Sequence, residues 1–183
     1  MYLLGGLDRP TSGEVFVDGA SLSAMGPAAL AGVRNRKIGF IFQFHYLMPE
    51  FTALENVMMP MLKFGRGRDE SKARARALLG DLGLAGKESR LPTQLSGGEQ
   101  QRVSIARSLA NEPRVILGDE PTGNLDTQNA DQVFRIFQGL ARERGQTLVV
   151  VTHDPRLAAR TDRVIRIVVG RITWDGPADR VLG

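Results

Sequence analysis

The sequence predicts an α/β fold in which helices cover a mostly parallel sheet. The first observation is a set of three apolar runs that are typical of buried strands: KIGFIFQ (37–43), RVILGDE (114–120) and TLVVVTHD (147–154). Each run is almost continuously apolar rather than alternating, as expected for strands covered on both faces of a parallel sheet. The second observation is that segments with helical periodicity separate the runs. Such an alternation of strands and helices is typical of α/β proteins.

A helical region is predicted between the first and second of these strands. ALENVMMPMLKFG (53–65) and DESKARARALLGDLGLA (69–85) have helix-like composition, and glycines separate them. In the second segment we expect Asp69 or Ser71 to cap the helix. We expect its apolar stripe to consist of Ala73, Ala77, Leu78 and Leu82.

A further helix is predicted just before the second strand. Val103, Ala106, Leu109 and Ala110 recur at helical spacing, and residues 111–113 (Asn-Glu-Pro) end the pattern. Ser96, Gly97 and Gly98 stand at its beginning. Glycines let an anion approach the backbone, and the first amides of a helix favour phosphate. A plain cap and turn is the alternative interpretation of the same three residues.

Composition limits the class of protein. The chain has 183 residues, 42% of them hydrophobic, which suits one compact domain with a smaller lobe. It has no Cys, which excludes disulfides and Cys-ligated zinc. No apolar run is long enough to span a bilayer, so a soluble intracellular domain is predicted, with any membrane role exerted through a partner. The formal charge is +4, and two basic stretches, 34–37 and 72–76, are interpreted as solvated faces rather than as sites for nucleic acid or anionic lipid.

Polar residues follow each of the three strands. Gln43 ends the first run, Asp119 and Glu120 end the second, and His153 lies at the end of the third. In open α/β sheets, ligands bind at the carboxyl ends of the strands. An amide, two carboxylates and an imidazole that meet at one edge therefore predict a functional site there. Ordinary strand termini are the alternative for any one of these residues alone.

Longer stretches resemble a known family. LSGGEQQRVSIARSLANEPRVILGDEPTGNLD (95–126) resembles the signature segment, Walker B strand and D-loop of ATP-binding cassette (ABC) ATPases. IFQFHYLMPEFTALENV (41–57) resembles the Q-loop of that family, and VVVTHD (149–154) resembles its switch-histidine strand. Within the family, these motifs most resemble those of the lipoprotein-releasing and macrolide-export transporters. The resemblance covers essentially the whole chain, with the elements in the family's order.

The resemblance implies a fold and a division into domains. It implies a P-loop NTPase (RecA-like) ABC ATPase core, formed by residues 1–49 and 101–183, and a helical subdomain formed by residues 50–100. Two local departures from the family pattern are Gly118, where Ala is common, and VVGRI (168–172), which replaces a usual Asp-Gly turn. The second departure is expected to weaken a hairpin near the C-terminus.

The resemblance also implies roles for the strand-end residues and the cofactors ATP and Mg²⁺. Asp119 is implied in the Mg²⁺ shell, Glu120 in orienting or deprotonating the attacking water, and Gln43 in contacting Mg²⁺ or that water. His153 is implied to contact the γ-phosphate. In phosphoryl transfer most of the catalysis is positioning and charge stabilisation, so these few polar groups suffice.

A second set of implied residues serves a head-to-tail dimer with two ATP molecules between the protomers. The signature residues are implied to bind ATP that is held by the other subunit, and the D-loop to lie at the dimer interface. These nucleotide-binding residues are Ser96, Gly97, Gly98, Gln100 and Asp126, with Asn124 and Leu125 as the rest of the D-loop.

The remaining implied partner is a transmembrane permease, contacted through the Q-loop and the helical subdomain. A groove for a permease helix is expected to be lined by Phe44, His45, Tyr46, Leu47 and Phe51. Packing within the helical lobe is the open alternative for each of these side chains. His45 is not expected to take part in chemistry, because it lies beyond the strand end. The implied location is the cytoplasmic face of the inner membrane, as a peripheral subunit.

One family motif is missing from the sequence. The resemblance places GxxxxGK[ST] just before LLGGLDRPTSGEV (3–15), and the 183 residues do not contain that pattern. We expect the absent stretch to include a central strand and an aromatic that stacks on adenine, and its lack to expose apolar edges. Without phosphate-binding amides and the motif's Lys, this polypeptide is expected to bind ATP weakly and not to turn it over usefully.

Several functions are open at this point. A mis-assigned start or fragment of a complete ATPase is favoured over a decayed gene product or a short regulatory half. The leading function is the ATP-binding subunit of an ABC transporter, with lipoprotein release from the inner membrane as the expected transport. The alternative is a non-hydrolysing interaction module that offers its signature motif to an intact partner. A cassette ATPase acting on nucleic acid is disfavoured, because the chain has neither long coiled-coil inserts nor a Cys-rich zinc module.

Overall fold

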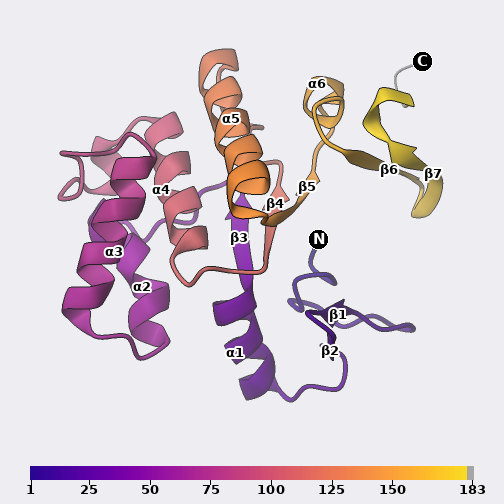
Figure 1. Cartoon of the computed structure of the whole chain (residues 1–183), viewed down its shortest axis with the longest axis horizontal. Coiled ribbons are helices and arrows are strands. Elements are labelled where there is room, and N and C mark those ends of the chain that lie inside the picture. The colour runs from indigo at the N-terminus through magenta and orange to yellow at the C-terminus, as the bar shows by residue number, and fades with distance from the viewer. Residues whose placement is uncertain (181–183) are drawn as a thin grey trace. The chain divides into compact units, whose positions relative to one another are not determined.

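The computed structural model describes residues 1–180, with the side chain of Arg144 left out. The chain forms two compact units, Met1–Val150 and Val151–Gly183, and each is considered by itself (Figure 1). The first unit holds the strands and helices that carry most of the predicted site. The predicted division into a core and a helical subdomain at 50–100 stays an interpretation.

The elements follow the predicted alternation. The helices, including two short 3₁₀ turns, are α1 (Pro27–Lys37), α2 (Ala53–Lys63), α3 (Arg68–Asp81), η1 (Pro92–Gln94), α4 (Gly97–Leu109), α5 (Thr127–Arg144), α6 (Pro155–Ala158) and η2 (Ala178–Arg180). The strands are β1 (Phe16–Val17), β2 (Ala20–Ser21), β3 (Ile38–Phe42), β4 (Val115–Asp119), β5 (Thr147–Val151), β6 (Arg163–Val168) and β7 (Arg171–Pro177).

The three predicted strands form one sheet in the order β3-β4-β5. β3 and β4 are parallel, and the register places Ile38 opposite Val115 and Phe42 opposite Asp119. The α/β fold with a parallel sheet is thereby confirmed. β3 and β4 are mostly buried, but every residue of β5 is partly or fully exposed, so the expectation that all three runs are buried on both faces is wrong for β5.

The main core lies where α4 packs against β3 and against the helices α2 and α3 (Figure 1). Its fully buried members come from the sheet and from all three helices. The largest of them are Ile41, Val57, Met61, Leu79, Val103, Ile105 and Ile116. This packing places α4 beside the sheet edge where the predicted site lies.

α2 begins as its sequence specifies. The Thr52 hydroxyl accepts from the Glu55 backbone N–H, and the Glu55 carboxylate accepts from the Thr52 backbone N–H, which together form a capping box. Asn56 is fully buried and exchanges two hydrogen bonds with the Met48 backbone. Its amide also donates to the Phe51 carbonyl. The chain between β3 and α2 is therefore fixed from the first turn of α2.

The predicted details of α3 are partly wrong. The helix begins at Arg68 after Gly67, which makes no side-chain cap, so neither Asp69 nor Ser71 is the cap residue. Ala73 and Ala77 are exposed. The buried side chains are instead Ser71, Ala75, Leu78, Leu79 and Leu82. Ala73 and Ala77 lie among charged residues, so the apolar periodicity is weak. The predicted stripe is therefore wrong by one or two positions at these alanines.

Apolar side chains are exposed near the N-terminus of the first unit. Leu3, Leu4 and Leu7 are each more than 40% exposed, although Gly5 packs closely on the Phe40 ring of β3. β1 and β2 form a short antiparallel pair that encloses a smaller apolar cluster with α1.

The second unit contains the antiparallel hairpin of β6 and β7. Its turn residues, Val169 and Gly170, both have positive φ, of 47° and 71°. This is the backbone that a two-residue hairpin turn requires, and Val is poorly suited to it because of its branched Cβ. The hairpin that was expected to be weakened therefore forms, with the strain placed on Val169.

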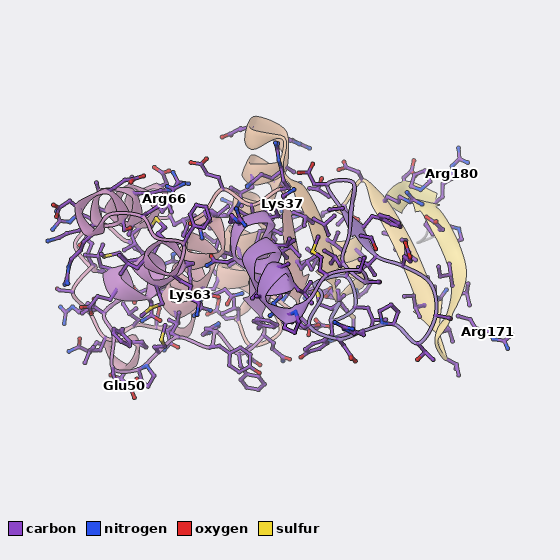
Figure 2. All side chains as sticks on the ribbon, turned by 90° about the horizontal axis from the view of Figure 1, so that it is seen from below. Lys37, Glu50, Lys63, Arg66, Arg171 and Arg180 are labelled. Atoms are coloured by element: carbon purple, nitrogen blue, oxygen red, sulfur yellow. The ribbon has the colours of Figure 1, made fainter. Side chains whose placement is uncertain are left out.

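The two basic stretches make contacts within the first unit. The Lys37 ammonium pairs with Asp18 at 2.7 Å, and the Arg34 guanidinium donates to the Gly6 carbonyl at 2.8 Å. Arg74 donates to the carbonyls of Leu109 and Ala110 at the end of α4. Figure 2 labels two further ends of helices that carry a basic residue, Lys37 at the end of α1 and Lys63 at the end of α2.

Across residues 1–180, no helix combines the length and the apolar character needed to cross a membrane.

Candidate functional site

The strand ends that carry the predicted site meet as expected in the first unit. Because Phe42 lies opposite Asp119, Gln43 and Glu120 leave the sheet side by side at the carboxyl edge. Gln43, Asp119 and Glu120 are all partly exposed, so their polar groups are accessible from that edge. The register thus places Gln43 on the strand next to Asp119 and Glu120, and the predicted meeting of their polar groups with His153 in one site stays a prediction.

Gln43 is tied to the D-loop residue Asn124. The Gln43 amide N–H donates to the Asn124 side-chain oxygen at 3.1 Å, and the Asn124 amide donates to the Gln43 carbonyl at 3.2 Å. A Cβ on Gly123 would lie 3.0 Å from the Gln43 amide nitrogen, so the glycine makes room for this clasp. The Q-loop and the D-loop are therefore joined by reciprocal hydrogen bonds.

Glu120 lies in a strained turn. Its φ is 45°, in the left-handed region that non-glycine residues rarely adopt. The Gly123 backbone N–H donates to the Glu120 carbonyl at 3.0 Å and closes the turn after β4. Strain of this kind persists only where surrounding contacts hold it, and it concentrates at functional sites.

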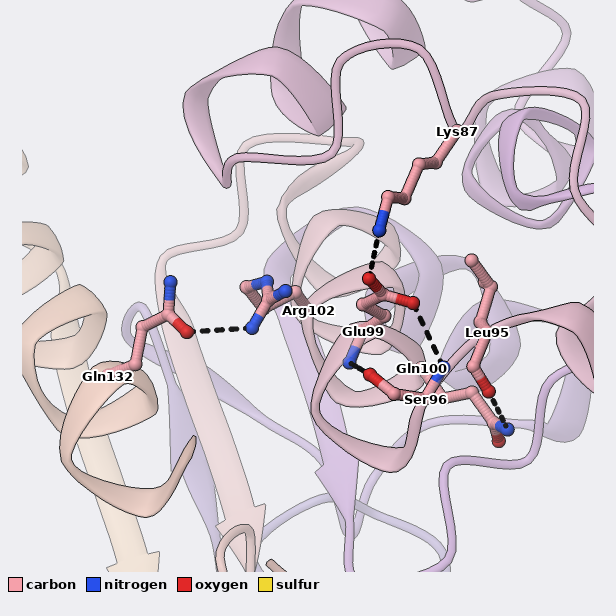
Figure 3. A network of polar contacts seen from close by, with 7 residues as sticks. All are labelled: Lys87, Leu95, Ser96, Glu99, Gln100, Arg102 and Gln132. Atoms are coloured by element: carbon pink, nitrogen blue, oxygen red, sulfur yellow. Dashed lines mark hydrogen bonds and ion pairs between the residues drawn. The ribbon is translucent and has the colours of Figure 1, made fainter. Parts of the chain in front are cut away.

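The first turn of α4 is held by a network of polar contacts (Figure 3). The Ser96 hydroxyl accepts from the Glu99 backbone N–H, and the Glu99 carboxylate accepts from the Ser96 backbone N–H at 2.9 Å. The Lys87 ammonium also pairs with this carboxylate. The Lys87 hydrogen bond, followed by that from the Ser96 backbone, lowers the pKa of Glu99. The capping box thus fixes the start of the signature helix.

The predicted signature residues differ in exposure. Ser96 and Gly97 are exposed at the N-terminus of α4, where the helix dipole and the first amides attract anions. Gly98 is buried, and a Cβ there would come within 2.1 Å of the Asn129 side-chain oxygen. The Gln100 amide donates to the carbonyls of Pro92 and Leu95. Gln100 therefore stabilises the turn at residues 92–95, which precedes α4.

Asp126 is the N-cap residue of α5. Its carboxylate accepts from the Asn129 backbone N–H at 2.9 Å and from the Asn129 side chain at 2.7 Å. These Asn129 hydrogen bonds lower the pKa of Asp126. Since Gly98 packs on the same Asn129, the D-loop and the signature helix share one neighbour.

His153 belongs to the second unit, two residues after the end of β5. The next residue, Asp154, caps α6, with its backbone N–H bound to the Thr152 hydroxyl at 3.0 Å. The position of His153 relative to Glu120 therefore stays a prediction.

Two polar residues of α4, Gln101 and Arg107, make long-range contacts that the sequence does not predict. Gln101 is fully buried, and its amide donates to the Pro121 carbonyl at 2.6 Å. The Gln101 oxygen lies within hydrogen-bonding distance of the His45 ring nitrogen Nδ1. Arg107 donates to the carbonyls of His45 and Tyr46 at 2.7 and 2.6 Å. These contacts join segments far apart in sequence, and no local pattern announces them.

The residues at the sheet edge suit a phosphate-bound Mg²⁺. Among residues 1–180 no group of three or more His, Cys, Asp or Glu is arranged to hold a metal. Mg²⁺ bound to substrate phosphates needs only one or two protein oxygens. The Asp119 carboxylate and the neighbouring Gln43 side chain provide that donor set.

A mainly apolar pocket of about 450 Å³ opens beside the Q-loop in the first unit. It is lined by Phe42 and Met48, by Met59 and Pro60 of α2, and by basic side chains that include Lys63. Of the five residues expected to line a partner groove, Phe44 and Tyr46 are 65% exposed, and none of the five is among the lining residues. The pocket is therefore lined by Phe42 and Met48, which flank residues 44–47 in sequence, and not by the residues that were expected to line it.

Comparisons with known proteins agree with these motifs. The family model described as "ABC transporter" matches residues 1–123. The chain is 54% identical over 176 residues to "Lipoprotein-releasing system ATP-binding protein LolD 1" of Chlorobium chlorochromatii, covering 96% of this chain and 72% of that protein. It is 52% identical over 177 residues to the protein LolD of Aquifex aeolicus, covering 94% of this chain and 79% of that protein.

Solved structures give the same result. A dimeric post-hydrolysis state of the ATP-binding cassette MJ0796 bound to ADP and Pi is similar with a TM-score of 0.88 and 39% identity. The match covers 97% of this chain and 78% of that chain. A second dimeric structure of MJ0796, titled a bacterial ABC transporter cassette, matches with the same TM-score and 40% identity.

Proposed function

The chain belongs to the ABC transporter family of ATP-binding proteins, and from this premise we propose that it serves a transporter that releases lipoproteins from a membrane. The observation that carries the proposal is the 54% identity, over nearly the whole chain, to a protein named for that activity. The strand-end cluster and the capped signature helix supply the matching chemistry.

The strand-end residues divide the work of ATP hydrolysis. Asp119 and Gln43 would hold Mg²⁺, which neutralises phosphate charge as it develops. Glu120, which lies in the left-handed turn that follows β4, would orient the attacking water and accept its proton. The clasp between Gln43 and Asn124 keeps the amide beside this turn. His153 contacts the γ-phosphate.

The signature end of α4 serves a nucleotide held by a second ATP-binding subunit. Ser96 and Gly97 present a hydroxyl and exposed backbone amides at a helix N-terminus, which suits a terminal phosphate. Lys87 offsets the negative charge of Glu99, which lies in the same turn. The two similar structures of MJ0796 are dimers, in agreement with a two-subunit site.

The permease partner is assigned to the apolar pocket beside the Q-loop. An apolar helix end from a transmembrane subunit fits the pocket lined by Phe42, Met48 and Met59. Its binding would affect the position of Gln43, which follows Phe42 in sequence. Through this contact the chain is held at the cytoplasmic face of the membrane as a peripheral subunit. The basic rim residue Lys63 favours an acidic or carbonyl-rich helix terminus in the partner.

Reconstitution tests the transport role. Membrane subunits of a lipoprotein-releasing transporter, freed of their own ATP-binding subunit, are placed in vesicles, and binding of the purified chain is measured by flotation. The chain is expected to float with these vesicles and not with empty ones. Met59→Glu in the pocket is expected to abolish flotation, and Leu62→Glu, an exposed position on the same helix, to preserve it. Equal flotation of both variants, or none for the unaltered chain, overturns the assignment.

Nucleotide binding by the chain alone is expected to be weak. The 183 residues contain no GxxxxGK[ST], whose backbone amides and Lys hold the phosphates. Titration with a fluorescent ATP analogue should show no saturation below about 1 mM, the upper end of ordinary KM values. Saturable binding in the micromolar range would contradict this expectation.

A second candidate function rests on the exposed signature turn. A chain that binds ATP weakly by itself can still lend Ser96 and Gly97 to ATP held by an intact partner. In that case the ATP affinity of this chain is the same with and without the partner. The partner's rate of ATP hydrolysis, in contrast, depends on the presence of this chain.

A further inference from the structure

We propose that Gln101, a buried glutamine in the middle of α4, is a positioning residue that fixes the Glu120 turn and the Q-loop in one arrangement. The inference rests on the role proposed above for Glu120. Its evidence is a set of long-range hydrogen bonds that no local motif requires.

The Gln101 amide group has no freedom in its assignment. The nitrogen donates to the Pro121 carbonyl at 2.6 Å, and a carbonyl can only accept. The side-chain oxygen of Gln101 therefore faces His45 and accepts from Nδ1–H of the ring. Burial, together with the nearby charge of Arg107, lowers the pKa of His45, and the neutral ring has one N–H to give. Gln101 thus donates to the Pro121 carbonyl and accepts from the His45 ring, so it links these two groups.

The bond to Pro121 acts on a strained part of the chain. Pro121 directly follows Glu120, whose φ is 45°, a left-handed conformation that is unfavourable for a non-glycine residue. The Gln101 side chain is fully buried, so water cannot replace its bond to the Pro121 carbonyl. Gly123 closes the same turn from its other end. Glu120 is held between these two hydrogen bonds.

The Q-loop has a matching arrangement. Tyr46 also has a positive φ, of 45°, and its carbonyl accepts from Arg107 at 2.6 Å. The next carbonyl upstream, that of His45, accepts from the same guanidinium at 2.7 Å. Both strained turns are therefore anchored on α4: Gln101 contacts the Pro121 carbonyl of one turn and the His45 ring beside the other, and Arg107 holds the second turn.

This arrangement makes α4 a common support for the Q-loop and the Glu120 turn. A displacement of the helix would move the Pro121 carbonyl and the His45 ring together. Positioning by Gln101 differs from simple packing because its loss loosens the Glu120 turn without unfolding the helix.

The first experiment needs no variant. Nitrogen-15 NMR of the imidazole in the full 183-residue chain reports which ring nitrogen of His45 carries the proton. We expect the Nδ1–H tautomer at neutral pH. The Nε2–H tautomer would leave the Gln101 oxygen without its donor and would overturn the proposal.

The second experiment compares two glutamine-to-leucine variants. Gln101→Leu removes both bonds, and Gln132→Leu is the matched control, because the Gln132 oxygen accepts from Arg102 of α4 at 2.8 Å, away from the Glu120 turn. Hydrogen exchange of the Gly123 amide, relative to the amides of α4, is expected to accelerate about tenfold in Gln101→Leu, as for one lost hydrogen bond of about 1.4 kcal/mol. In Gln132→Leu the relative rate stays unchanged.

The same samples report the backbone of Glu120. Its Cα and Cβ chemical shifts and its HN–Hα coupling are expected to move away from left-handed values in Gln101→Leu only. Unchanged Gly123 exchange, or equal acceleration in both variants, would show that Gln101 only packs. If Gln101→Leu does not fold, Gln101→Met is measured in its place, because its unbranched side chain has a similar volume but cannot donate to the Pro121 carbonyl. The same acceleration at Gly123 is then expected, and its absence overturns the proposal.

Discussion

The first turn and the middle of α4 carry polar residues that are held in different ways. Ser96 and Glu99 in the first turn are capped by each other, three residues apart, with Lys87 as the added partner. Gln101 in the middle of the helix and Arg107 in its last turn donate to carbonyls 20 and 61 residues away in sequence. Ser96 and Gly97 of the first turn are thus exposed and the cap is local, whereas the later residues tie two loops to the helix. A ligand can bind the first turn without disturbing the fold, but a change in the middle reaches the strand-end site.

The largest expected effect is the loss of Arg107. Arg107→Met keeps much of the side-chain volume but leaves the carbonyls of His45 and Tyr46 without their donor. We expect a loss of about 2–3 kcal/mol in the free energy of unfolding, as for hydrogen bonds from a charged group. Urea denaturation of the chain measures it. A loss below about 0.5 kcal/mol, the usual range for surface changes, would remove the distinction between the two parts of α4.

The two signature glycines offer a matched pair. Gly98→Ala places a Cβ against the Asn129 side chain, and we expect it to cost about 1–3 kcal/mol, as overpacking does. Gly97→Ala meets nothing within 4 Å and is expected to change stability by less than about 0.5 kcal/mol. Thermal unfolding of both variants decides the matter. Similar losses for the two would contradict the contact between α4 and α5.

A smaller effect is expected at the cap. Ser96→Ala removes the hydroxyl that accepts from Glu99 and should cost about 1 kcal/mol. Because the bond is local, exchange of the α4 amides should quicken only in the first turn. Faster exchange at Gly123 as well would show that the first turn and the middle are coupled, against the comparison drawn above.

The smallest effect concerns pH. Lys87 lowers the pKa of Glu99, so the pair adds stability at pH values above the unfolded-state pKa, and this is lost as the pH falls through the lower folded-state value. Lys87→Met raises the pKa of Glu99 and should cost at most about 0.5 kcal/mol at pH 7, because the pair is partly solvated. The difference from the unaltered chain should shrink below about pH 4. A difference that grows in acid would contradict the assignment of this pair.

Local sequence signals predicted much of the fold and of the site. Neighbouring residues specify periodicity and strand register. These two properties predict the three strands, the helix after Ser96 and the position of Gln43 beside Asp119 and Glu120. The stripe of α3 was misplaced because alanines among charged residues give little amphipathic contrast.

Long-range contacts could not be predicted. Gln101 lies among other polar residues in a glutamine-rich stretch, and only the packing of α4 on the sheet shows that its amide is buried and faces Pro121. His45 was set aside because it lies beyond the strand end, and it is Gln101 that gives it a partner. The strain at Glu120 and Tyr46 likewise follows from tertiary contacts, since neither residue type favours a positive φ.

The central claim is that the exposed first turn of α4 completes an ATP site held by a second subunit. An intact relative whose signature serine is replaced by arginine is mixed with this chain, and steady-state ATP hydrolysis is measured. We predict that the unaltered chain restores hydrolysis to the disabled relative and that the Ser96→Arg chain does not. No restoration by the unaltered chain, or equal restoration by both, would contradict the account.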